Sequence, residues 1–156
     1  MARLARIASV ATLLFAAAAL AACGDDNTDK NRYVRQLTAA QTRFQTTQER
    51  LESDATQSSS ASQNRRALSR FAASIADTIT ALREIDVPPE VVAEHRRFVG
   101  VFMAWHDDVT RFVRAIKNPT RSGFQRARRR IAAATTMFNQ SSRQAATEID
   151  AKLESS

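Results

Sequence analysis

The segment IDVPPE at residues 85–90 separates two stretches in which apolar residues recur at helical spacing. Its prolines end the first stretch, because a proline pushes the residue before it out of helical geometry. Pro89 can then open a second helix, with Glu90 in the first turn, where the helix dipole favours an acid. A connection this short makes the two helices antiparallel neighbours.

The two helices beside this turn have the strongest apolar patterns in the chain. We expect the first over residues 62–85, where the spacing alternates between three and four residues as in a bundle core. The second, over residues 89–117, has the widest apolar arc and should be the most buried element. The apolar residues are Leu68, Phe71, Ile75, Ile79, Leu82 and Ile85 in the first, and Val91, Phe98, Phe102, Val109, Phe112 and Ile116 in the second.

Weaker patterns on either side predict two further helices. One covers residues 29–54 and is followed by a Ser-, Ala- and Gln-rich stretch at 57–63 that we interpret as a loop. The other begins after the break at residues 118–120 and extends towards the C-terminus. Their apolar stripes consist of Leu37, Ala40, Phe44 and Leu51, and of Phe124, Ile131, Phe138, Ala145, Ile149 and Leu153.

Together these patterns predict an all-α fold, an up-down-up-down antiparallel four-helix bundle over residues 29–156. The composition agrees, since three glycines, three prolines and one tyrosine in 156 residues argue against a sheet. The alternative is a three-helix body with a loose first helix, because residues 29–54 offer the fewest apolar anchors.

The N-terminal segment has the form of an export signal. Arg3 and Arg6 precede an apolar run at residues 7–19 that is too short to span a bilayer. The run closes with Leu20-Ala21-Ala22-Cys23, which resembles the lipobox of bacterial lipoprotein precursors. The resemblance implies that the signal peptide is removed before Cys23 and that Cys23 is acylated.

On this interpretation residues 1–22 are a cleaved signal peptide, and residues 23–28 are a short tether. The protein would be extracytoplasmic and anchored to the bacterial cell membrane, because several acyl chains together give stable anchoring. The alternatives are a secretory peptide cut after Ala19 or Ala21, or an uncleaved membrane helix. Neither explains why the only cysteine follows the signal, where a free thiol would be open to oxidation.

A second resemblance covers the turn itself. Residues 82–90, LREIDVPPE, followed by His95, are similar to the interhelical segment of actinobacterial helical lipoproteins. That segment often combines a leucine, an apolar residue, one or two prolines and a downstream histidine. The resemblance implies a helical lipoprotein and no particular activity.

Residues suited to catalysis are sparse. His95 and His106 lie about 16 Å apart along one helix, so one metal ion cannot bind both. Met103 and His106, one turn apart, could ligate copper or haem, but we interpret both histidines as hydrogen-bonded residues at the edge of the core. The sequence has no nucleophile, phosphate-loop, di-iron or covalent-haem motif. We therefore predict no catalytic residue, no metal, no cofactor and no enzyme activity.

Positive charge is concentrated in one region of a chain whose net charge is +7. No acid occurs between Val109 and Thr147. At 100° per residue, arginines of the last helix fall on the face opposite its apolar stripe, where guanidinium groups can bind phosphate or carboxylate. The alternative is a solvated face without a function. The candidate residues for an anionic partner are Arg114, Lys117, Arg121, Arg126, Arg129 and Arg130.

In the predicted bundle this basic hairpin lies about 40 Å from the tether, at 1.5 Å per residue. Lipid headgroups are not its target, because the Debye length is about 8 Å. We therefore expect a lipid-anchored interaction or scaffold protein that binds an anionic cell-wall polymer or an acidic protein, and not nucleic acid. The alternatives are a ligand or metal sensor near His95, Met103 and His106, and a regulator of a neighbouring membrane protein, which would self-associate or expose Trp105.

Overall fold

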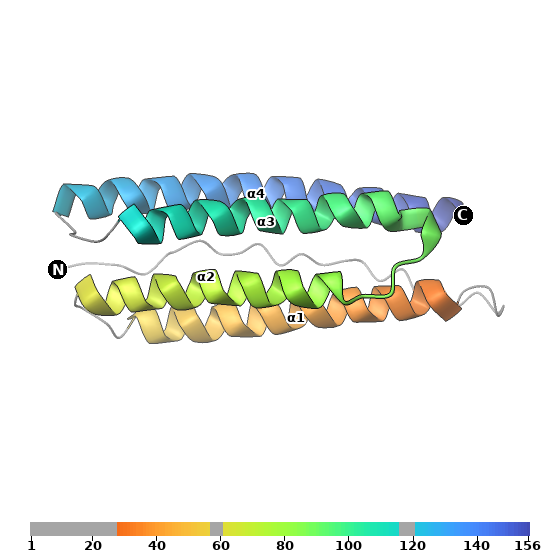
Figure 1. The fold of residues 1–156 in the computed structure, drawn as a ribbon, viewed down its shortest axis with the longest axis horizontal. Coiled ribbons are helices and arrows are strands. Elements are labelled where there is room, and N and C mark those ends of the chain that lie inside the picture. Colours follow the sequence, from red (N-terminus) through yellow and green to blue (C-terminus); the bar gives the residue numbers. More distant parts are fainter. Residues whose placement is uncertain (1–27, 57–60, 116–120) are drawn as a thin grey trace.

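The computed structural model describes residues 28–56, 61–115 and 121–156. Four helices pack in sequence: α1 (Thr28–Thr56), α2 (Ala61–Arg83), α3 (Val92–Ala115) and α4 (Arg121–Ser155). Figure 1 shows α1 and α2 as one layer and α3 and α4 as a second, with each helix antiparallel to the one before it. The predicted all-α, up-down four-helix bundle is confirmed.

The two ends of the bundle differ in which helices begin there. At one end lie the start of α1, the turn between α2 and α3, and the C-terminus, and we call it the turn end (Figure 1). At the other lie the last turns of α1 and α3 and the first turns of α2 and α4, and we call it the basic end.

The turn between α2 and α3 follows the proline prediction. α2 ends at Arg83, two residues before the predicted end. Pro89 opens a short 3-10 helix, η2 (Pro89–Val91), in which the amide of Val91 donates to the carbonyl of Pro88 at 3.1 Å. α3 follows directly, because the fixed φ of proline suits a first helical turn.

α1 belongs to the core, so the alternative of a three-helix body is wrong. Leu37 is buried as predicted, and Phe44 makes edge-to-face contacts with Phe102 and Trp105 of α3, at centroid distances of 5.9 and 5.8 Å. The buried stripe of α1 begins at Tyr33, one turn before its predicted start.

The stripe also contains a buried glutamine that apolar spacing did not predict. Gln48 Nε2 donates to Ser74 Oγ of α2 at 3.0 Å, and the Ser74 hydroxyl donates to the Phe71 carbonyl at 2.8 Å. This chain of hydrogen bonds makes a polar pair tolerable between packed helices. Leu51, which was predicted to be in the seam, is only half-buried.

An aromatic cluster joins α1, α2, α3 and α4. The Trp105 indole stacks on Phe138 of α4, with centroids 3.9 Å apart and an interplanar angle of 13°. Phe71 of α2 meets Trp105 edge-to-face at 5.2 Å, and Phe102 meets Phe138 at 4.8 Å. Such pairs add about 0.5–1.5 kcal/mol each to their burial. Trp105 is therefore a core residue, 2% exposed.

Near the turn end, a buried pair of hydrogen bonds links three helices. The Leu82 carbonyl oxygen can only accept, so His95 Nε2, at 3.0 Å, carries the proton. His95 Nδ1 then accepts from the Tyr33 hydroxyl at 3.1 Å. Burial lowers the pKa of His95, against the opposing effect of the Leu82 carbonyl, and favours the neutral ring. Burial, with the charges of Asp150 and Glu94, raises the pKa of Tyr33, which stays a donor.

Asp150 of α4 is half-buried at the same end. Burial, reinforced by the charge of Glu154, raises the pKa of its carboxyl from 3.8 to about 6. The folded state therefore binds more protons than the unfolded chain between these two values. By linkage, this carboxyl lowers the stability of the fold as the pH rises through that window.

Gly100 lies in the middle of α3, where glycine is the least favourable ordinary residue after proline. A Cβ placed on Gly100 meets no atom within 4 Å. Neither a close approach nor a positive φ requires glycine at this position.

Replacing Tyr33 by Phe should lower the free energy of unfolding by about 1–3 kcal/mol, because His95 Nδ1 loses its donor in a buried site. Urea denaturation followed by circular dichroism measures this loss. Unchanged stability would show that the Tyr33–His95 bond contributes nothing to the packing of α1.

The Asp150→Asn variant should be more stable than the parent at pH 8, by about 1 kcal/mol at most, because solvent screens a half-buried group. The gain should shrink towards pH 4, where the parent carboxyl is also neutral in the folded state. Thermal unfolding at both pH values provides the measurement, with exposed Asp77→Asn as the matched control. An equal gain at both pH values would contradict this explanation.

The Gly100→Ala variant should raise the free energy of unfolding by about 0.5–1 kcal/mol, because alanine loses less backbone entropy in a helix and finds open space here. Urea unfolding would reveal the gain as a higher midpoint at an unchanged slope. A destabilised variant would mean that the space beside Gly100 is needed.

Candidate functional site

Exposed arginines gather at the basic end on α3 and α4. Arg114 is exposed in the last turn of α3, and Arg126, Arg129 and Arg130 are exposed on α4. Lys117 lies outside the described residues. Arg121 is the first residue of α4, but its side chain is outside the described part.

The contact between Trp105 and Phe138 sets the register of α3 against α4. In this antiparallel pair, the residue nine positions after Trp105 on α3 lies at the level of the residue nine positions before Phe138 on α4. Arg114 therefore lies at the level of Arg129 and Arg130. The structure brings these predicted site residues to one level of the bundle.

Two arginines that the sequence analysis did not select lie at nearly the same level. Arg65 and Arg66 of α2 are exposed and precede Phe71, whose ring contacts Trp105 of α3. The antiparallel register of α2 and α3 places them opposite residues 110–111. Arg65 and Arg66 lie outside the acid-free stretch between Val109 and Thr147, so that stretch does not point to them. The predicted up-down topology does point to them, because it places the start of α2 at this end.

Most of the exposed arginines at the basic end have no close carboxylate among the described side chains. Arg111 approaches Asp108 at 3.4 Å. Of the side chains that the structure describes, no carboxylate lies within 4.0 Å of the other exposed arginines. These are Arg65, Arg66, Arg114, Arg126, Arg129 and Arg130.

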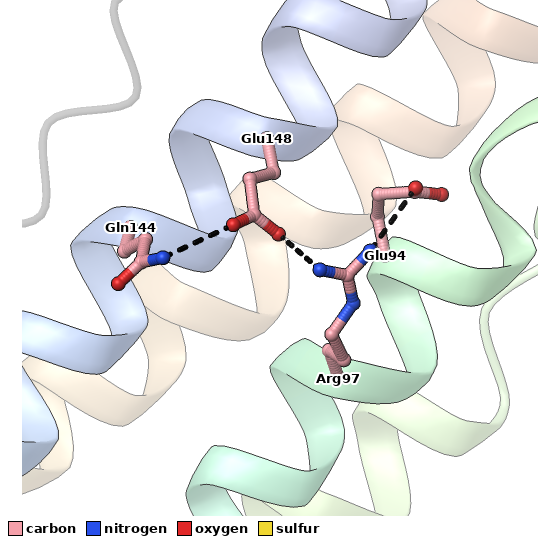
Figure 2. A network of polar contacts seen from close by, with 4 residues as sticks. All are labelled: Glu94, Arg97, Gln144 and Glu148. Carbon is pink, nitrogen blue, oxygen red and sulfur yellow. Dashed lines mark hydrogen bonds and ion pairs between the residues drawn. The ribbon is translucent and has the colours of Figure 1, made fainter.

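One arginine towards the turn end is ion-paired with two acids. Figure 2 shows Arg97 of α3 between two carboxylates, with Glu148 of α4 at 2.7 Å and Glu94 at 3.3 Å. Gln144 donates to the second oxygen of Glu148 at 3.2 Å. Arg97 is therefore ion-paired within the bundle, unlike the six exposed arginines just named.

The positive dipole ends of α2 and α4 lie at the basic end, together with the negative dipole ends of α1 and α3. α2 and α4 begin there, and neither has an acid in its first turn. α1 and α3 begin at the opposite end with Asp29 and Glu94 in theirs. A helix N-terminus carries about half a positive charge, so basic residues near it are unfavourable until an anion binds.

A groove of about 510 Å³ runs between α3 and α4 on the outer face of the bundle. Its lining includes Gly100 and Ala104 of α3 and Ala134 of α4, with Met137 69% exposed at its side. Trp105 also lines it, and the indole Nε1 is buried without a hydrogen-bond partner among the described residues. The groove is a second, mainly apolar surface that the sequence analysis did not identify.

The two histidines contact polar groups within the fold. Both ring nitrogens of His95 are engaged in hydrogen bonds. His106 is half-buried, 3.4 Å from the Thr110 hydroxyl and 3.6 Å from Asp107, whereas Met103 accepts from Arg83 at 3.1 Å. In the described part of the chain, no three His, Cys, Asp or Glu side chains are arranged to hold a metal ion.

The predicted signal peptide, Cys23 and the predicted tether up to residue 27 lie outside the described residues, whereas Thr28 is the first residue of α1. Of the helices that are described, none is long and apolar enough to cross a bilayer.

Searches with the whole chain found no matching family model, no matching curated protein and no matching solved structure.

Proposed function

We propose that this chain is a lipid-anchored, extracytoplasmic interaction or scaffold protein whose basic end binds an anionic cell-envelope polymer or an acidic protein. The observation that carries the proposal is the group of exposed arginines without acidic partners at one end of the bundle. Ion pairing inside the fold does not account for these charges, so an external anion is their natural partner.

The direction of the helices supports an orientation for this site. α1 begins five residues after Cys23, the residue with the lipobox pattern, and its 29 residues span about 40 Å. A lipid on Cys23 would hold the turn end near the bilayer and point the basic end away from it. Because that separation is several Debye lengths, the arginines would meet envelope components and not the lipid headgroups.

We also infer that the protein is not an enzyme and needs no cofactor, because its sequence has none of the nucleophile, metal or cofactor motifs considered above. The groove between α3 and α4 favours a second candidate, a helical bundle that binds an apolar ligand. Met137, which is exposed at its side, would meet that ligand. The burial of Trp105 is unlike the exposure expected of a regulator.

Reversing three charges at the basic end, with Arg126→Glu, Arg129→Glu and Arg130→Glu, should abolish salt-sensitive capture of envelope material by the purified, acylated protein. Its helix content should stay unchanged, because all three side chains are exposed. The matched control reverses Arg35, Arg96 and Lys152, which are exposed towards the turn end. Equal capture by both variants would reject the basic end as the binding surface.

The anchor is tested separately with Cys23→Ala. This variant should leave the membrane fraction after a salt wash, because it has no thiol to acylate. Retention of the variant in the membrane would show that a lipid on Cys23 is not the anchor.

A further inference from the structure

The arginines of the basic end form a band across three helices. Arg65 and Arg66 lie on α2, Arg114 on α3, and Arg129 and Arg130 on α4, all within about one and a half turns of the same level. Because α3 packs against both α2 and α4, the band spans two helix–helix spacings, or about 16–20 Å. An extended ligand fits such a band better than a small, compact anion.

Among the described side chains, the band has no exposed large apolar residue that could anchor a folded protein partner. Among the side chains that the structure describes, the exposed large apolar residues are Met103 and Met137. Met137 follows Arg130 by seven residues, about 10 Å further along α4, and Met103 accepts from Arg83, more than two turns before Arg114. Protein interfaces take most of their energy from buried aromatic and apolar anchors, so this surface is better suited to a polymer held by charge.

All the described cations of the band are arginines. A guanidinium group donates in a planar fork, which matches both phosphate and carboxylate. The acceptor directions of a carboxylate lie near one plane, whereas the tetrahedral phosphoryl group accepts from donors that approach from several directions. Closely spaced arginines on neighbouring helices therefore favour phosphate over carboxylate.

From these three observations we infer that the partner is a phosphate-bearing polyanionic chain, and that Arg65 and Arg66 of α2 bind it together with Arg114, Arg129 and Arg130. The inference rests on the proposed function for the location of the site, and it adds the chemical class of the ligand and two further binding residues.

Inorganic polyphosphate and polyglutamate of equal charge number serve as probes for the full acylated protein in detergent, with affinity measured over a range of salt concentrations. Polyphosphate should bind at least about tenfold more tightly, with a steep decrease in affinity as salt rises. The Arg65→Ala, Arg66→Ala double variant should bind polyphosphate about tenfold more weakly. Its log–log salt slope should be smaller in magnitude by about 1.4, since two phosphate contacts are lost.

The matched control is the Arg35→Ala, Arg96→Ala double variant, which removes two exposed charges towards the turn end and should bind as the parent does. Polyglutamate binding as tight as polyphosphate binding would overturn the phosphate assignment. A double variant at Arg65 and Arg66 with the affinity and slope of the control would overturn the role of α2. If polyphosphate does not bind while the reversal at Arg126, Arg129 and Arg130 still abolishes capture of envelope material, this inference fails and the proposed function stands.

Discussion

Each helix of this chain is apolar along one stripe only, and the turn at Pro88 and Pro89 is too short to let the chain continue in the same direction. The stripes can be buried only if consecutive helices reverse and pack against one another. That constraint places the starts of α2 and α4 together, and with them the arginines that follow each start. The charge asymmetry of the molecule, on which the proposed function rests, is therefore a consequence of helix direction.

The core that maintains this arrangement is aromatic in the middle and polar near the turn. Trp105 stacks on Phe138 and receives the edges of Phe44 and Phe71, so one side chain contacts the other three helices. Towards the turn, His95 accepts from Tyr33 and donates to Leu82. A hydrogen bond depends on the position and direction of both partners much more than apolar packing does. We infer that this pair helps to define how α1 sits against α3.

Contacts between helices hold some of the charged side chains towards the turn end. Arg97 is enclosed by Glu94 and Glu148, and Lys30 at the start of α1 donates to the carbonyl of Leu153 near the end of α4 at 3.4 Å. At the basic end, no described carboxylate lies within 4.0 Å of six exposed arginines, which are Arg65, Arg66, Arg114, Arg126, Arg129 and Arg130. Solubility alone does not require these arginines to be clustered at one end of the bundle.

The fold and the inner face of each helix followed from the sequence, because apolar spacing and proline geometry are local properties. The stripe at Ile131, Phe138, Ala145, Ile149 and Leu153 could be read directly from its period. The tertiary structure alone decided the hydrogen-bond partners of the buried polar side chains. Gln48 bonds to Ser74 and Tyr33 to His95, across separations of 26 and 62 residues in the sequence. The tertiary structure also decided that Arg65 and Arg66 lie at the same end as the arginines of α3 and α4. The reason is that a surface consists of residues that are adjacent in space, and the packing of whole helices sets which residues those are.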